Sequence, residues 1–235
     1  MLSKSAKTVV RTRFPVRALA TPAESNTTSH APQLKYQPLS KAQKAFLERV
    51  VRVDQAGELG ANYIYAGQYF VLANRYPHLK PVLKHMWEQE IHHHDTFNQL
   101  QTAKRVRPSI MTPFWKVGAF GIGLSTASLS KEAAMACTVA VETVIGGHYN
   151  EQLRVLMNQF SIGAVDAETG EVIANPPVSP EIASLKETVK QFRDEELEHL
   201  DTALEHDAEK AVPYMLLTEA IKATCKVAIW TAERI

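Results

Sequence analysis

Long hydrophobic runs and phosphate-binding glycine loops are missing from this sequence, and each absence removes a class of protein. The most apolar stretch, residues 113–129, is interrupted by Lys116 and is shorter than the roughly 20 apolar residues of a membrane-spanning helix. The formal net charge is +1 and the sequence has no long basic stripe, so no nucleic-acid partner is predicted. No dinucleotide-binding fingerprint is present either.

Cysteine is scarce, and the two residues present lie far apart without CxxC spacing, at Cys137 and Cys225. Such a pair favours reduced, half-buried thiols in a reducing compartment over a disulfide or a zinc site.

The first part of the chain lacks acidic residues, none of which occurs before Glu24. It is rich in basic residues, with serine and threonine interspersed and apolar residues scattered. A secretory signal needs a continuous apolar block, so the pattern predicts a mitochondrial targeting peptide. A disordered basic tail is the alternative. We therefore expect a targeting peptide and linker over residues 1–35 and one domain over residues 36–235, with a loop insertion at 161–180.

Strand-like alternation is absent over any useful length, and the rest of the chain has helical spacing. Ser40 is a candidate N-cap, and prolines punctuate the pattern. The predicted long helices cover 41–75, 81 to about 107, about 130–160 and about 180–206. Shorter apolar helices are expected at 112–129 and from Pro213 onward. The predicted fold class is all-α, a ferritin-like four-helix bundle with additional amphipathic helices at a membrane-facing side.

Each long helix carries a glutamate on its apolar face, at Glu58, Glu90, Glu142 and Glu196. A carboxylate in a core costs several kcal/mol unless it is neutralised, paired or bound to metal. Two divalent cations would balance all four charges. The second and fourth helices add His93 and His199, each three residues after its glutamate.

One glutamate from each of two helices and Glu-x-x-His from each of two others is the ferritin-like di-iron arrangement. The six residues are therefore predicted as metal ligands and as the catalytic centre: Glu58, Glu90, His93, Glu142, Glu196 and His199. His94 is the alternative to His93. Glu195 and Glu198 are interpreted as surface charges, and Asp54 either as a hydrogen-bond acceptor for a ligating histidine or as a surface residue.

Glycine lies beside these positions, in the segment AGELGA around Glu58 and at Gly146, one turn after Glu142. Glycine inside a helix costs about 1 kcal/mol relative to alanine. Close helix packing and space for oxygen and a flat substrate are both compatible with its presence.

At these residues the sequence resembles the 5-demethoxyubiquinone hydroxylases of ubiquinone biosynthesis, particularly the fungal members. The resemblance runs from about Leu39 to the C-terminal AIWTAERI. The strings that carry it are RVDQAGELGANYIYAGQYF, HMWEQEIHHH, AVETVIGGHYNEQLR and FRDEELEHLDTA.

The resemblance implies a mitochondrial monooxygenase, bound peripherally to the matrix side of the inner membrane, that hydroxylates a polyprenylated demethoxyubiquinol. It implies two iron ions as cofactor, dioxygen as oxidant and NADH as electron donor. It also implies a multiprotein ubiquinone-synthesis complex with a lipid-binding partner. The family's His-Tyr pair corresponds to His148 and Tyr149, implicated in handling substrate or electrons.

The apolar helices at 112–129 and at the C-terminus are expected to lie on the membrane and guide the isoprenoid tail. The residues expected at that surface are Tyr214, Met215, Leu216, Ile221, Val227 and Trp230. Packing on the bundle or a homodimer interface is the alternative. Iron storage, a structural metal site and other di-iron chemistries use the same ligand set and remain rival functions.

Overall fold

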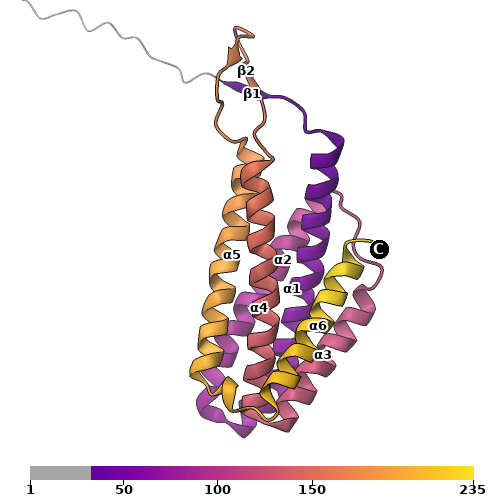
Figure 1. Cartoon of the computed structure of the whole chain (residues 1–235), viewed down its shortest axis with the longest axis vertical. Helices are drawn as coiled ribbons and strands as arrows, with labels where there is room; N and C mark the ends of the chain where they lie inside the picture. Colours follow the sequence, from indigo (N-terminus) through magenta and orange to yellow (C-terminus); the bar gives the residue numbers. More distant parts are fainter. Residues whose placement is uncertain (1–32) are drawn as a thin grey trace, which may run out of the picture.

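The computed structural model describes residues 33–235, and this part of the chain is an all-α bundle. Its α-helices are α1 (Lys41–Arg75), α2 (Lys80–Ala103), α3 (Thr112–Leu129), α4 (Lys131–Asn158), α5 (Pro180–Glu205) and α6 (Tyr214–Ala232). Helices α1, α2, α4 and α5 form the four-helix bundle, and α3 and α6 lie side by side along one flank (Figure 1). The predicted ferritin-like fold is confirmed. The predicted targeting peptide falls almost entirely outside the described residues.

The helix ends follow local capping chemistry. Ser40 caps α1: its hydroxyl accepts the backbone N–H of Gln43 at 3.2 Å, and the Gln43 side chain accepts the Ser40 N–H at 2.9 Å. Helix α2 ends at Ala103, earlier than the predicted Arg107, because Arg105 has a left-handed φ of 54° that a helix does not continue through. Two 3₁₀ turns, Pro77–Leu79 and Ala208–Lys210, link neighbouring helices.

A small sheet at one end of the bundle is a feature that the sequence patterning misses. Strands β1 (Leu34–Tyr36), β2 (Ala164–Asp166) and β3 (Val172–Ile173) pair antiparallel in that order. The insertion at 161–180 is therefore a hairpin, and the segment before α1 forms its third strand (Figure 1). Strands of two or three residues are too short to show alternation, which is why the sequence did not predict them.

Two glycines set the position of α3 against α1. A Cβ at Gly67 would lie 2.5 Å from the Phe120 carbonyl oxygen, and one at Gly123 would lie 2.0 Å from the Ile64 carbonyl oxygen. Neither contact is sterically tolerable, so the two backbones approach each other only because both positions are glycine. This crossing fixes α3 as one wall of the flank that α3 and α6 form.

The outer faces of α3 and α6 carry exposed apolar side chains. The largest are Phe114, Val117, Leu129, Met215, Leu216, Val227 and Trp230. Two of the residues predicted for this surface lie elsewhere: Ile221 is only 7% exposed in the core, and Tyr214 is half-buried against a core cluster. Within residues 33–235, no helix combines the length and apolarity needed to cross a bilayer.

Candidate metal centre

Two layers of apolar core enclose the predicted ligands along the bundle axis. Phe97, Tyr149 and Phe192 belong to one buried cluster, and Met86 and Met135 belong to another. On each bundle helix the buried glutamate lies between residues of these two clusters. The cores on both sides hold the four glutamates at one level and keep them away from bulk water.

The structure brings all six predicted ligands together. Glu58, Glu90, Glu142, Glu196, His93 and His199 are each at most 1% exposed. They form two overlapping groups whose ligand atoms lie within 4.8 Å of one another: Glu58, Glu90, His93 and Glu196 in one, and Glu90, Glu142, Glu196 and His199 in the other. Glu90 and Glu196 are common to both groups, while Glu58 and Glu142 each belong to one.

The histidines turn the same nitrogen toward the centre. Nδ1 of His93 lies 3.1 Å from Glu196 Oε1 and 3.4 Å from Glu58 Oε2. Nδ1 of His199 lies 3.1 Å from both Glu90 Oε1 and Glu196 Oε2. Because Glu196 contacts both imidazoles through different oxygens, it occupies the middle of the cluster. His94, the alternative to His93, points away and contacts Gln55 and Asn98 instead.

Two tyrosine hydroxyls donate hydrogen bonds to Glu58 and Glu142, called here the outer glutamates because each belongs to only one ligand group. The Tyr65 hydroxyl on α1 donates to Glu142 Oε1 on α4 at 2.8 Å, and the Tyr149 hydroxyl on α4 donates to Glu58 Oε1 on α1. Each tyrosine lies two turns after the glutamate of its own helix. Its hydroxyl donates to the glutamate of the other helix, so α1 and α4 are linked in both directions. Tyr149 is thus in contact with the candidate metal centre, as its predicted position two turns after Glu142 allows.

His148, predicted together with Tyr149, stands outside the cluster. Its Nε2 lies 3.9 Å from Asp54 Oδ1, and burial lowers its pKa. Asp54 is fully buried and accepts a hydrogen bond from Gln152 at 2.6 Å. The interpretation of Asp54 as a surface residue or a partner of a ligating histidine is therefore wrong.

The partners of the ligating histidines are two residues of other helices. Glu195 Oε2 lies 2.6 Å from His93 Nε2, and Gln89 Oε1 lies 3.0 Å from His199 Nε2. The interpretation of Glu195 as a surface charge is thus wrong, since its side chain is only 23% exposed. A signal was available in the sequence: each residue directly precedes a Glu-x-x-His motif and can accept a hydrogen bond.

The electrostatics of the cluster favour binding of cations. Burial and the charge of Glu196 raise the pKa of Glu90 to about 8, and burial raises the pKa of Glu142 well above its usual value. Burial alone lowers the pKa of His93, but the hydrogen bonds of Glu196 and Glu58 outweigh it and raise the pKa to about 12. The raised pKa values mean that the cluster binds protons, and these protons reduce the repulsion between its carboxylates.

Several carboxylate oxygens of the cluster have no hydrogen-bond partner although they are buried. Glu90 Oε2 and Glu142 Oε2 have none, and Glu58 Oε2 and Glu90 Oε1 lie near only the Nδ1 atoms of His93 and His199, at 3.4 and 3.1 Å. Buried acceptors without partners are rare in folded proteins because they forfeit solvation without compensation. Their convergence with two imidazole nitrogens fits a pair of divalent cations, for which four carboxylates supply the balancing charge.

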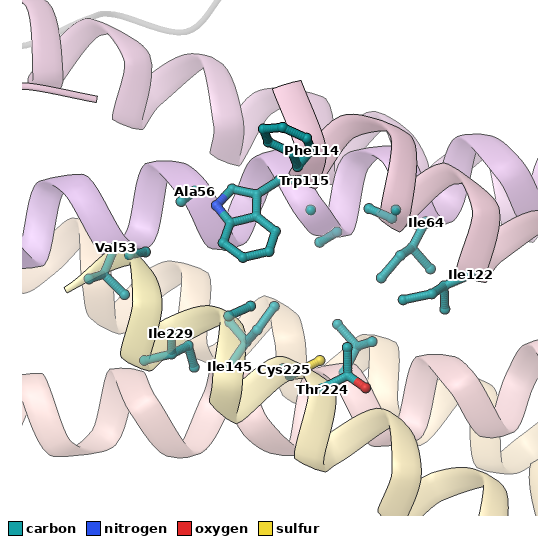
Figure 2. A pocket seen from close by; sticks show the side chains of 18 residues that line it. Val53, Ala56, Ile64, Phe114, Trp115, Ile122, Ile145, Thr224, Cys225 and Ile229 are labelled. Atoms are coloured by element: carbon teal, nitrogen blue, oxygen red, sulfur yellow. The ribbon is translucent and has the colours of Figure 1, made fainter. Parts of the chain in front are cut away.

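An apolar cavity of about 200 Å³ lies between α1, α3, α4 and α6. Figure 2 shows Trp115 and Ile122 of α3 facing Ile145 of α4 and Cys225 and Ile229 of α6 across it. Gly57 and Ala61, one residue before and three residues after Glu58, line the cavity, and so do Val141 and Ile145, which have the same spacing from Glu142.

The glycines of the AGELGA segment open this space rather than permit close packing. A Cβ at Gly57 or Gly60 would meet no atom within 4 Å, and both residues line the cavity. Gly146 differs, because a Cβ there would make ordinary contact with Leu197 at 3.9 Å.

Both cysteines are free thiols, as predicted. Cys137 is buried beneath the flank, and Cys225 reaches the cavity wall. Burial raises the pKa of Cys137 to about 12 and that of Cys225 to about 11, so both stay protonated at neutral pH.

Known proteins are similar in sequence to this chain over nearly all of its described residues. The family model described as Ubiquinone biosynthesis protein COQ7 matches residues 45–232. The 5-demethoxyubiquinone hydroxylase, mitochondrial, of Saccharomyces cerevisiae is 67% identical over 206 residues, covering 88% of this chain and 84% of the relative. The human NADPH-dependent 3-demethoxyubiquinone 3-hydroxylase, mitochondrial, is 46% identical over 84% of this chain and 82% of its own.

A bacterial relative extends the likeness further. The 3-demethoxyubiquinol 3-hydroxylase of Rhodospirillum rubrum is 40% identical over 191 residues, which is 81% of this chain and 79% of the relative. The family match covers α2, α4 and α5 and all but the first four residues of α1, and it includes every residue of the candidate metal centre. The chain belongs to the family described as Ubiquinone biosynthesis protein COQ7.

Proposed function

We propose that this protein is a di-iron monooxygenase that hydroxylates the ring of a polyprenylated demethoxyubiquinol, a late step of ubiquinone biosynthesis. The observation that carries the proposal is a buried carboxylate-histidine cluster, on helices α1 and α4 that also form walls of an apolar cavity. The family match and the printed names of the relatives supply the substrate class.

Two iron ions would be held by the six ligands, with Glu90 and Glu196 shared between them. Iron in such a centre activates dioxygen and stores the electrons that the hydroxylation consumes. Glu58 and Glu142 would each contribute to one ligand group, and the two tyrosine hydroxyls hold these carboxylates in place. The surrounding apolar side chains exclude water from the centre, which protects a reactive oxidant from side reactions.

The cavity is the site proposed for the quinol ring. Its walls are almost entirely apolar, and they include residues one before and three after Glu58 and Glu142. A flat ring placed there would face the ligand helices, while the isoprenoid tail would leave between α3 and α6. Thr224 and Cys225 are the polar side chains on the α6 side of this route.

The outer faces of α3 and α6 are proposed to rest on the matrix side of the mitochondrial inner membrane. Exposed Phe114, Val117, Leu216 and Trp230 supply apolar area, and Lys222, Lys226 and Arg234 lie on or beside α6. Apolar area flanked by cations is typical of helices that bind the interface of an anionic membrane. The relatives from yeast and human carry the designation mitochondrial.

The same exposed surface is available to protein partners. We propose that these partners are a multiprotein ubiquinone-synthesis complex and, within it, a lipid-binding protein that presents the quinone, as the family resemblance implies. A homodimer through this flank is the alternative use of the surface.

The experiment that tests the function is mass spectrometry of the quinone product. The purified iron-loaded protein is incubated with a short-tailed demethoxyquinone, isotopically labelled dioxygen and either NADH or NADPH. We expect one labelled oxygen in the product, with NADH as the effective donor, and no product from Glu142→Ala. The human relative is named as NADPH-dependent, so the comparison of the two nucleotides decides the electron donor.

Iron storage is the rival that uses the same ligands. It predicts iron oxidation without a quinone product and a large shell on gel filtration. That pair of results would overturn the proposed function.

A further inference from the structure

The residue that precedes the glutamate of each Glu-x-x-His motif accepts a hydrogen bond from the histidine of the other motif. Gln89, which precedes Glu90 on α2, accepts from Nε2 of His199 on α5 at 3.0 Å. Glu195, which precedes Glu196 on α5, accepts from Nε2 of His93 on α2 at 2.6 Å. Each motif therefore orients the histidine of the other motif.

The contacts around the two candidate ion sites are otherwise matched. Each site has one outer glutamate held by a tyrosine of the facing helix, one histidine whose Nδ1 faces the carboxylates, and the two shared glutamates. The departure from this symmetry is chemical: one histidine is held by a carboxylate and the other by a neutral amide. A further contact fixes the carboxylate, because Gln191 donates to Glu195 Oε1 at 2.9 Å and leaves Oε2 for His93.

A hydrogen bond to a charged acceptor is shorter and roughly twice as strong as one to a neutral acceptor. Such a bond fixes the ring orientation of a ligating histidine and strengthens its donation to the metal. The separations in the structure follow that order, at 2.6 Å for Glu195 and 3.0 Å for Gln89.

We propose that Glu195 and Gln89 are positioning residues that make the two metal sites unequal, so that the site of Glu58 and His93 binds its ion first and more tightly. The inference rests on the proposed metal centre and adds the origin of its asymmetry. The His199 site is the weaker one, from which an ion is lost more readily.

The weaker site also lies nearer to solvent. Gln89 and His199 line a cleft of about 270 Å³ between α2 and α5, together with Pro81, His85, Glu198 and Thr202. Water in this cleft can solvate a charge at position 89, so the isosteric change Gln89→Glu is compatible with the fold. The exchange Gln89→Glu/Glu195→Gln keeps the total charge and both acceptors and only swaps their positions.

The test uses Co²⁺, which reports its binding by absorption and its position by anomalous X-ray diffraction. The metal-free full chain is titrated in solution, and crystals grown with one equivalent of Co²⁺ show which site is filled. We expect two binding steps in the wild type, with the first ion beside His93. Mutation of an outer-shell partner typically weakens metal binding 10–100-fold, so Glu195→Gln, which removes the charge of the acceptor, should weaken the first step by about that factor.

The double exchange gives the decisive result. We expect the first ion to move to the site beside His199, with little change in overall affinity. Glu187→Gln, an exposed change two turns earlier on α5, is the matched control and should leave both steps unchanged. If Glu195→Gln does not fold, Gln89→Glu alone should tighten the second step and bring the two affinities closer.

The inference is overturned if the wild type fills both sites equally, or if the double exchange leaves the filling order unchanged. Absence of any Co²⁺ or Fe²⁺ binding by the wild type would instead overturn the metal centre of the proposed function.

Discussion

The hydroxyl of Tyr149 on α4 donates a hydrogen bond to Glu58 on α1, across the centre of the bundle. The reverse contact joins Tyr65 on α1 to Glu142 on α4. These two contacts couple the helices that carry the unshared ligands, so the outer carboxylates are held in place before a metal arrives. The arrangement supports a centre that is organised by its protein framework.

Removing one of these hydroxyls should destabilise the metal-free protein. Tyr149→Phe leaves a buried Glu58 oxygen without its donor, which costs about 1–3 kcal/mol. The free energy of unfolding of the metal-free chain in urea measures this loss. Tyr63→Phe, on the same helix as Glu58 but half-buried, is the control and should change stability little. Equal stability of Tyr149→Phe and the wild type would contradict the contact.

An isosteric change at an unshared ligand should remove one metal ion and leave the other. Glu142 belongs to a single ligand group, and Glu142→Gln still accepts from Tyr65 through its amide oxygen. We expect metal content to fall from about two ions per chain to about one, with the helical circular dichroism unchanged. Elemental analysis of the purified protein measures the content. Full retention of both ions would place Glu142 outside the centre.

Metal affinity should rise with pH. In the metal-free state the hydrogen bonds of Glu196 and neighbouring carboxylates overcome the effect of burial and raise the pKa of His93 to about 12 and that of His199 to about 10. Both imidazoles are then protonated at neutral pH, and a metal must displace these protons to reach Nδ1. Higher pH lowers the cost of that displacement. Fe²⁺ titrations between pH 6 and 8 in a weakly buffered solution should show proton release, and pH-independent binding would contradict the expected linkage.

Side chains added at Gly60 should affect the stability of α1 and the binding of quinone in the cavity differently. Gly60 lies inside α1, its Cβ position is empty, and it lines the cavity. Gly60→Ala should stabilise the helix by about 0.5–1 kcal/mol, and Gly60→Leu should lower quinone affinity while metal content stays constant. Thermal unfolding and product formation measure the two effects.

The matched control for that experiment is Gly121→Ala in α3, where the Cβ space is also open but the residue does not line the cavity. It should gain similar stability without losing activity. A Gly60→Leu variant with wild-type quinone affinity would place the substrate elsewhere.

Membrane binding should depend on the outer faces of α3 and α6. Leu216→Glu and Trp230→Glu put charge on exposed apolar positions of α6, so each should release the protein from anionic liposomes in a co-sedimentation assay. Val172→Glu is the control, because it adds the same charge at an exposed apolar residue of β3, in the sheet at the end of the bundle. Unchanged co-sedimentation of the α6 variants would exclude this face as the contact.

The repeated pattern in the sequence was sufficient to predict the bundle and the residues of the centre. Each apolar helix face carries a glutamate, and two of these glutamates are followed by a histidine at i+3. Few structures can accommodate this pattern, because buried carboxylates require a compensating charge or hydrogen bonds. The repeat of the Glu-x-x-His spacing favoured His93 over His94, and the structure brings His93 into the cluster and turns His94 away from it.

Other features depended on contacts between segments that no local pattern contains. The role of Glu195 follows from the packing of α5 against α2, and the burial of Asp54 follows from Gln152 on α4. Alone in the sequence, each looks like an ordinary helical acid.

The sequence by itself determined which side chains converge, because helical periodicity and the cost of burying charge act along single helices. Only the tertiary structure decided which carboxylates are shared, which residues orient the histidines, and where the cavity opens. These properties depend on distances between helices, such as the close approach of α3 to α1 at Gly67 and Gly123. Helix periodicity fixes the face that a residue occupies, but the packing of the helices fixes its partner.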